Sequence, residues 1–332
     1  MLKVLIGVLS LLLVLALIPV VVIACSAPSS PPPMASMAGP FSKVRFDDVP
    51  APREFRARDG TSLQYYAYPA SQDKIAVLVH GTVGPGTSMH GVAKALRNAG
   101  VSAYVLDIRG HGGSGRRGDI DYIGQIDDDL ADLVTTLGPE KSGQVRTLVG
   151  WSGGAGFAIR FAGGRYGELF DRYVFLSPIL PGAPTLRPNA GGWINISMPR
   201  VVTIAWLDRL GIHLFDGADV ISYAVAPQNT QGTRNYSYRL FVNFNASPEF
   251  GSYLKNIRRP ATVLVGTADE QVVADQFTPL FQRLDVNIPV TIVPGMTHVG
   301  MIATPTALHA DVNAVSPHNE GQALRRQQVA VP

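Results

Sequence analysis

The 332-residue chain is poor in cysteine and in charged side chains, and both shortages exclude whole classes of protein. A single cysteine rules out a disulfide-stabilised scaffold and a zinc site built on cysteines. Charged residues make up 16% of the chain, against about 25% in an ordinary soluble domain. The net charge of +3 comes without any basic run, which argues against a nucleic-acid partner. The high apolar content excludes a disordered chain.

Much of the apolar excess lies at the N-terminus. Residues 4–24 are apolar apart from Gly7, Ser10 and Pro19, and Lys3 is the only charge before them. The run exceeds the ~7–15 residues of a usual signal-peptide core and approaches the ~20 that cross a bilayer as a helix. Residues 1–24 are therefore predicted to be either a signal peptide or an uncleaved anchor with Lys3 on the cytoplasmic side.

The only cysteine stands at the end of this run. Val22-Ile23-Ala24-Cys25 resembles a bacterial lipobox, although Val22 stands where leucine is commoner, so Cys25 is a candidate for lipidation. Both the lipoprotein and the single-pass anchor place the body of the protein in the cell envelope, outside the cytoplasm and tethered to a membrane. Cleavage without lipidation would instead give a secreted protein. Residues 25–40, rich in Pro, Ser, Ala and Met, are predicted to form a flexible linker.

Regular apolar patterns begin near residue 41 and predict a mostly parallel sheet. Asp59-Gly60 indicates a hairpin that adds antiparallel strands at one edge. Continuous apolar strands that alternate with helices are typical of a parallel sheet covered on both faces. The predicted strands are 54–58, 62–68, 74–79, 101–107, 145–150, 173–177, 261–266 and 290–293. The predicted helices are 88–99, 120–137, 153–162 and 272–284, with another near His298.

A long segment interrupts this alternation after the strand at 173–177. Residues 179–259 are rich in aromatics, Asn and Gly, with one clear helix at 201–210. Because the segment leaves the carboxyl end of a strand, where ligands bind in open α/β sheets, it is predicted to be an inserted cap. The whole folded domain is predicted to span residues 41–313, and the polar residues 314–332 a loose tail.

One motif carries the chemistry. Gly150-Trp151-Ser152-Gly153-Gly154 is a G-x-S-x-G between a predicted strand and a predicted helix. Gly150 and Gly154 permit a tight turn that lifts the serine hydroxyl above the sheet. Ser152 is therefore the candidate nucleophile, and the alternative is an incidental serine in a glycine-rich turn.

A serine nucleophile needs a base and an acid that orients the base. In this architecture the acid follows the serine in sequence, and the histidine follows the acid. Asp269 lies just past the strand at 261–266, and His298 just past the last strand. The neighbouring Glu270 remains an alternative acid. Three other histidines are weaker candidates for the base: His213, His309 and His318.

Two backbone N–H groups are needed to stabilise an oxyanion. Gly153 opens a helix and so has an unpaired N–H, and Thr82, after the strand at 74–79, is the second candidate. Gly84-Pro85-Gly86 lacks the lysine of a phosphate loop. The G-x-G-x-x-G at residues 110–115 is followed by a polar break instead of a helix, so a dinucleotide site is rejected.

Taken together, these motifs resemble the α/β-hydrolase superfamily. The resemblance is carried by His80-Gly81, the stretch Asp107-Ile108-Arg109-Gly110-His111-Gly112-Gly113-Ser114, the serine motif, Asp269 and His298. It covers residues 65–308 and is strongest to monoacylglycerol lipases, lysophospholipases and serine aminopeptidases. In these relatives the stretch at 107–114 is a structural loop beside the site. Trp151 and Gly153 depart from the Gly-His-Ser-Met-Gly common among the lipases.

The resemblance implies a serine hydrolase that cleaves carboxylic esters through an acyl-enzyme, with no metal or organic cofactor. A small-molecule or lipid ester is the expected substrate. An aminopeptidase, which would need carboxylates to hold a free amine, is the alternative; the cap offers Asp208, Asp216, Asp219 and Glu249. A non-catalytic binding protein of the same fold is a further alternative. Some cap aromatics are expected to line an acyl pocket: Trp193, Trp206, Tyr223, Tyr236, Tyr238, Phe241, Phe244, Phe250 and Tyr253.

Overall fold

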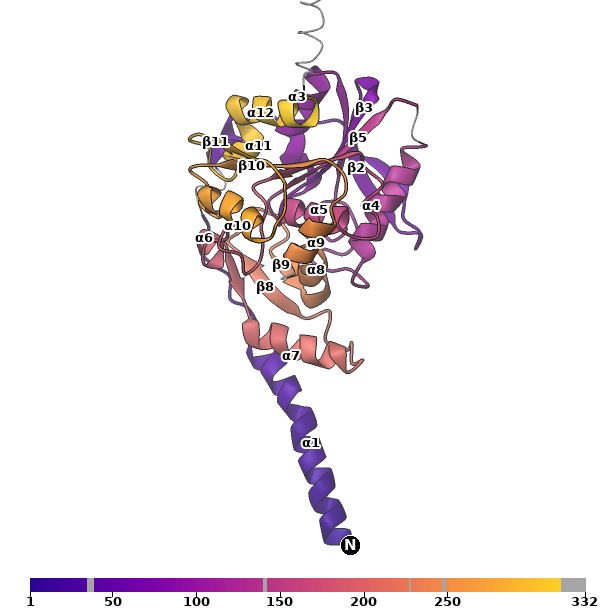
Figure 1. Ribbon diagram of the computed structural model, residues 1–332. Helices are drawn as coiled ribbons and strands as arrows, with labels where there is room; N and C mark the ends of the chain where they lie inside the picture. The colour runs from indigo at the N-terminus through magenta and orange to yellow at the C-terminus, as the bar shows by residue number, and fades with distance from the viewer. Residues whose placement is uncertain (35–38, 140–141, 227, 247–248, 318–332) are drawn as a thin grey trace, which may run out of the picture.

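The computed structural model describes residues 1–34, 39–139, 142–226, 228–246 and 249–317. Its centre is an eight-stranded sheet in the order β1-β2-β4-β3-β5-β6-β10-β11. The strands are β1 (Arg53–Arg56), β2 (Ser62–Tyr68), β3 (Ser71–Val79), β4 (Val101–Leu106), β5 (Val145–Trp151), β6 (Arg172–Leu176), β10 (Ala261–Gly266) and β11 (Val290–Val293). From β4 to β11 all neighbours are parallel, while β1 and β2 add antiparallel strands at one edge. The predicted α/β class, with its antiparallel edge, is confirmed (Figure 1).

Helices cover both faces of this sheet. The side chains of β3 alternate between the two faces and so belong to two separate buried clusters. Val77 and Val79 belong to one buried cluster and Ala76 and Leu78 to the other, because successive side chains of a strand point to opposite faces. The first cluster includes side chains of α4 (Gln125–Thr136), α5 (Gly153–Ala162) and α10 (Phe277–Arg283). The second includes side chains of α3 (His90–Asn98), α11 (Gly300–Ala303) and α12 (Pro305–Val315).

The segment between β6 and β10 holds a second, smaller sheet that the sequence pattern did not predict. Its antiparallel strands are β7 (Ile194–Ile196), β8 (Asp219–Tyr223) and β9 (Asn235–Ser237). The helices of the segment are α6 (Asn189–Gly192), α7 (Met198–Arg209), α8 (Tyr238–Asn243) and α9 (Phe250–Asn256). Strands of three to five residues leave too short an alternation to be recognised in sequence.

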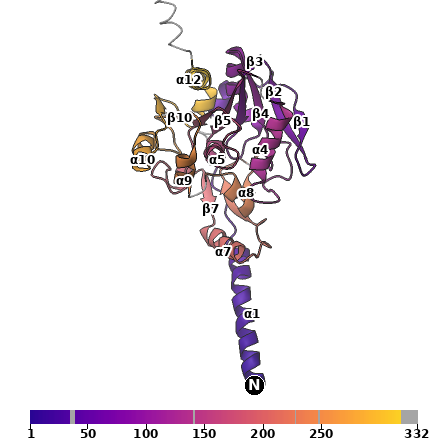
Figure 2. The same ribbon diagram turned by 45° about the vertical axis from the view of Figure 1, so that its right-hand side comes forward.

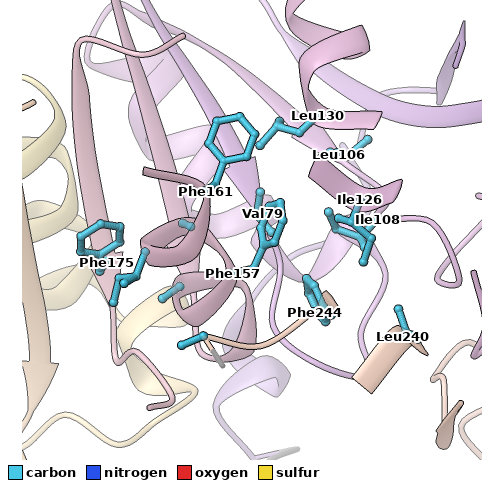
Figure 3. Close-up of a cluster of buried hydrophobic side chains, with 14 of the residues drawn as sticks. Val79, Leu106, Ile108, Ile126, Leu130, Phe157, Phe161, Phe175, Leu240 and Phe244 are labelled. Atoms are coloured by element: carbon cyan, nitrogen blue, oxygen red, sulfur yellow. The ribbon is translucent and has the colours of Figure 1, made fainter. Parts of the chain in front are cut away.

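The end of this segment packs into the main core. Leu240 of α8 and Phe244 just after it lie in one cluster with Ile108, Ile126 and Phe157 (Figure 3). All five side chains are fully buried. The small sheet is therefore joined to the main body through a continuous apolar core. This contact limits independent movement of the cap.

The prediction of a helix over 272–284 is wrong for residues 272–276. The helix α10 begins only at Phe277, after a short 3₁₀ turn at Ala274–Gln276. The residues before it pair with the cap segment, since Val273 N–H donates to Thr185 O and Arg187 N–H to Gln271 O. These extended contacts use backbone groups that a helix would need.

At the N-terminus, α1 (Leu2–Cys25) is long and apolar enough to cross a membrane. It projects from the folded body, and its last turns contact α7 (Figures 1 and 2). Residues 26–34 of the predicted linker lie against the cap: Ser29 O and Oγ accept hydrogen bonds from Asn195, and the hydroxyl of Ser30 pairs with that of Ser222. Residues 35–38 and the tail beyond 317 lie outside the described residues, and α12 runs two residues past the predicted end of the domain.

One buried carboxyl in α12 predicts a pH-dependent stability. Asp311 is fully buried, neither of its oxygens has a hydrogen-bond partner in the described chain, and burial raises its pKa well above the usual value. An unfolded Asp titrates near ~3.9. Above that pH the unfolded chain loses this proton while the folded chain keeps it. The free energy of unfolding therefore falls, by up to about 1.4 kcal/mol per pH unit, until the folded pKa is passed.

We expect Asp311→Asn to raise the thermal unfolding midpoint at pH 8 more than at pH 5, because the amide carries no charge at either pH. Thermal unfolding in detergent at both pH values measures the difference. Asp275→Asn, at an exposed position, is the matched control and should shift both midpoints equally. A gain for Asp311→Asn that is independent of pH would contradict the prediction.

Candidate active site

The serine motif forms a sharp turn between β5 and α5. Ser152 adopts φ +57° and ψ −123°, a region that residues with side chains rarely occupy. Neither flanking glycine could be replaced: a Cβ on Gly150 would lie 2.4 Å from Gly154 O, and one on Gly154 2.2 Å from His80 O. The strained serine is therefore held by close backbone contacts, as the sequence predicted for Gly150 and Gly154.

Ser152, His298 and Asp269 lie in one hydrogen-bonded line at the carboxyl ends of β5, β10 and β11. His298 Nε2 is 2.7 Å from Ser152 Oγ, and His298 Nδ1 is 2.8 Å from Asp269 Oδ2. All three residues are buried. The imidazole therefore bridges the hydroxyl and the carboxylate with hydrogen-bonding geometry at both nitrogens.

The carboxylate is held in its charged form. Asp269 Oδ1 accepts the backbone N–H groups of Gln271 and Val272 at 2.9 and 3.0 Å. Burial alone would raise the pKa of Asp269. The charge and hydrogen bond of His298, together with the two backbone donors, outweigh burial and hold the pKa below its usual value. An ionised Asp269 can orient the imidazole and stabilise its cation.

The alternative residues occupy other places. Glu270 accepts the backbone N–H of His298 at 3.0 Å, so its carboxylate holds the histidine main chain and not the ring. His309 is exposed on α12, and His318 lies outside the described residues. His213 is exposed near the end of α7, where Asp208 and Asp216 converge on its Nδ1 at 2.6 and 3.2 Å. No sequence pattern indicated that Asp208 and Asp216 converge. They do converge, but on an exposed histidine.

Thr82 and Gly153 face each other beside the serine. A Cβ built on Gly153 would lie 2.5 Å from Thr82 Cγ2 and 3.5 Å from Thr82 N. In the described chain neither backbone N–H donates to a protein acceptor. Gly153 is the first residue of α5, where such an orphan donor is expected. The two N–H groups can therefore point at one developing negative charge.

A buried polar network holds the Thr82 loop. Sequence reasoning named its cap member Tyr236 only as a possible pocket aromatic and did not predict this role. Val83 has φ +80°, a strained value for a β-branched residue. Its N–H donates to the Tyr236 hydroxyl at 3.0 Å, and its carbonyl accepts Thr233 N–H at 2.8 Å. His111 Nε2 lies 2.6 Å from the same hydroxyl. No motif marks Tyr236, because only the fold brings β9 to this loop.

We expect Tyr236→Phe to lower kcat roughly ten- to a hundredfold while KM changes little. The ring still packs, but Val83 N–H loses its acceptor, so the strained loop beside Thr82 can relax. Steady-state kinetics with thermal unfolding measures the effect. Tyr238→Phe, at a neighbouring buried tyrosine, is the control. Equal kcat losses in both variants would contradict a role in holding the loop.

The stretch at 107–114 is a structural loop, as the resemblance implies. Asp107 Oδ2 accepts Gly113 N–H at 3.0 Å, and its other oxygen accepts the N–H of Gly86 at 2.5 Å. His80 joins the same region, since its Nε2 accepts Ile108 N–H at 3.1 Å. Burial lowers the pKa of His80 and of His111, so both rings are neutral parts of this scaffold.

An apolar cavity of about 300 Å³ lies next to the serine. Its lining includes Thr82, Trp151 and Val299, and Trp193 is the one cap aromatic from the expected set that lines it. Pro33 and Met34 of the predicted linker form another part of the wall. Trp151 also donates its Nε1–H to His298 O at 3.2 Å, so this indole both lines the cavity and holds the His298 backbone.

Comparison with known structures agrees with the fold. A monoacylglycerol lipase from Paleococcus ferrophilus is 21% identical, with a TM-score of 0.58 over 76% of this chain and 98% of that chain. A soluble variant of monoglyceride lipase from Saccharomyces cerevisiae is 16% identical, with a TM-score of 0.57 over 81% of this chain and 94% of that chain. Est1E from Butyrivibrio proteoclasticus, solved with ferulic acid, is 15% identical, with a TM-score of 0.53 over 84% and 100%.

A search of the curated proteins found no match to this chain. The family model described as serine aminopeptidase, S33, matches residues 70–302, well over half of the chain. That range begins just before β3 and ends within α11, so it contains Ser152, Asp269 and His298. The chain therefore belongs to the serine aminopeptidase S33 family of α/β-hydrolases, and it is a serine hydrolase.

Proposed function

We propose that this protein is a membrane-anchored hydrolase of carboxylic esters, with Ser152 as nucleophile, His298 as general base and Asp269 as the acid that orients it. The observation that carries the proposal is the continuous line from Ser152 Oγ through the imidazole to Asp269, with contacts of 2.7 and 2.8 Å. Such a line allows the serine to lose its proton as it attacks.

The mechanism has two acyl-transfer steps. Ser152 Oγ attacks the ester carbonyl while His298 Nε2 takes its proton, and the N–H groups of Thr82 and Gly153 stabilise the oxyanion. His298 then returns the proton to the leaving alcohol, which departs and leaves an acyl-serine. Water attacks this acyl-enzyme with His298 again as base, and collapse releases the carboxylic acid and free Ser152.

The cavity supports an ester with an apolar acyl group. Its lining within the described residues contains no carboxylate that could hold a free amine. Asp208 and Asp216, considered for that role, pair instead with the exposed His213. Trp151, Trp193 and Val299 offer apolar surface, which favours a hydrocarbon chain. The cavity therefore favours ester hydrolysis over aminopeptidase activity as the proposed function.

A chain-length series tests the substrate class. We expect p-nitrophenyl esters to be hydrolysed with kcat/KM that rises with acyl length until the cavity is filled, while aminoacyl p-nitroanilides are cleaved far more slowly. The Tyr238→Phe variant should keep the same length profile. Faster cleavage of the aminoacyl anilides than of every ester would overturn the ester proposal in favour of the aminopeptidase.

The anchor is proposed to be the retained helix α1, not a cleaved lipoprotein signal. Buried Arg200 donates through Nε to Ile23 O at 2.8 Å and through Nη1 to Asp219 O at 2.6 Å. Cleavage before Cys25 would remove the first acceptor and leave part of a buried guanidinium unpaired. Mass spectrometry of the native protein should find an intact N-terminus. A mature chain that begins at an acylated Cys25 would refute the retained helix.

A further inference from the structure

The outer side of cap helix α7 is apolar and exposed. Met198, Val202, Trp206 and Leu210 follow one another at intervals of four residues and are each at least 55% exposed. This spacing puts them on one side of the helix. Ile212 and Leu214, in the turn that follows, are also exposed. We call these six residues the α7 face.

The inner side of α7 is buried and carries two apolar side chains together with the hydrogen-bonded Arg200. Ile204 and Leu207 are buried against the small sheet and its surroundings, so the helix already has the contact that holds it in the fold. A surface helix of a soluble protein normally carries polar residues on its outer side. An exposed apolar side on a helix that is already packed on its other side is expected where an apolar medium covers it.

The position of α1 indicates what that medium is. The end of α1 is clamped to α7, because Ile23 is buried and its carbonyl accepts the Arg200 guanidinium. Both views show α7 lying across the end of α1, at the point where α1 leaves the folded part of the protein (Figures 1 and 2). If α1 crosses a bilayer, α7 cannot be held away from its surface.

We propose that the α7 face docks on the lipid bilayer from which α1 emerges, so that the cap lies on the membrane surface. This inference rests on the membrane anchoring proposed above. An apolar helix face that carries a tryptophan suits the interface between headgroups and acyl chains. Residues 26–34 are therefore a short connection that is fixed to the cap, and not a flexible spacer.

The docked arrangement brings the cavity close to the membrane. Nine residue steps separate Cys25, at the end of α1, from Met34 in the cavity wall. Even a fully extended chain of that length spans at most about 30 Å. A lipid ester leaving the outer surface of the bilayer thus has a short path to Ser152.

Fluorescence quenching by lipids tests the docking. The full chain is reconstituted in phosphatidylcholine vesicles, with or without dibrominated acyl chains, and Trp emission is compared with that of Trp206→Phe. Trp151 and Trp193 are buried, so the difference between the two proteins reports Trp206. We expect most of the Trp206 emission to be lost in brominated vesicles. Equal Trp206 emission in both vesicles would overturn the proposal.

A second variant and two further measurements distinguish a failure of the docking proposal from a failure of the anchoring or the catalytic proposal. Val202→Asp combined with Leu210→Asp should keep hydrolysis of a short soluble ester and reduce hydrolysis of a long-chain ester embedded in vesicles several-fold. An equal effect on both substrates would count against docking. Extraction of the wild type by alkaline carbonate would refute anchoring and docking together. Absence of soluble-ester hydrolysis, with Trp206 quenched, would refute the catalytic proposal alone.

Discussion

Ser152→Ala is expected to lower kcat for ester hydrolysis by about 10⁶-fold, because the nucleophile and the acyl-enzyme route disappear together. Residual activity should come only from the oxyanion donors and substrate binding, which the variant leaves in place. The same variant should lose labelling by a fluorophosphonate, which reacts with an activated serine. Kinetics on a soluble ester and gel fluorescence measure the two effects.

Ser114→Ala is the matched control for this experiment. Ser114 is also buried, but its hydroxyl accepts the backbone N–H of Gln64 at 2.8 Å, and it lies in the structural loop. Its removal should affect thermal stability more than labelling. Labelling that persists in folded Ser152→Ala would show that another residue reacts, and would refute the assignment of the nucleophile.

The second large effect concerns the acid. Asp269→Asn should reduce kcat about 10⁴-fold, because an amide in place of the carboxylate favours the wrong tautomer of His298 and cannot stabilise its cation. The loss should be much the same across the neutral pH range, since the pKa of Asp269 lies below its usual value and the wild-type carboxylate is already ionised there. Rates measured across the neutral range test this.

Glu270→Gln provides the comparison for the acid. The glutamine oxygen can still accept the His298 backbone N–H, so we expect only a small loss of kcat. The two carboxylates are adjacent in sequence, and no pattern distinguishes them. If Glu270→Gln lost more activity than Asp269→Asn, the roles assigned to the two acids would have to be exchanged.

Local patterns in the sequence were sufficient to predict the sheet, and they also pointed to the residues proposed here as catalytic. The parallel strands are continuous apolar runs that recur between helices, and such runs are recognisable without tertiary information. Gly150 and Gly154 indicated the serine turn, and the structure shows why glycine is required there: a Cβ at either position would collide with a backbone oxygen. The order of acid and histidine along the chain then favoured Asp269, with Glu270 as the alternative, and His298 over His309 and His318, which also follow the acid.

What the sequence by itself determined is thus a hydrolase fold, and it also predicted Ser152 and a short set of candidate partners, because these predictions depend on residues that are local or follow a known order. Only the tertiary structure showed that Asp269 contacts the His298 ring while Glu270 contacts its backbone, brought Tyr236 to the strained Val83, and placed Met34 in the cavity wall. It also placed the helix α7 across the end of α1. These contacts join segments far apart in the chain, and their formation depends on packing that no local pattern records.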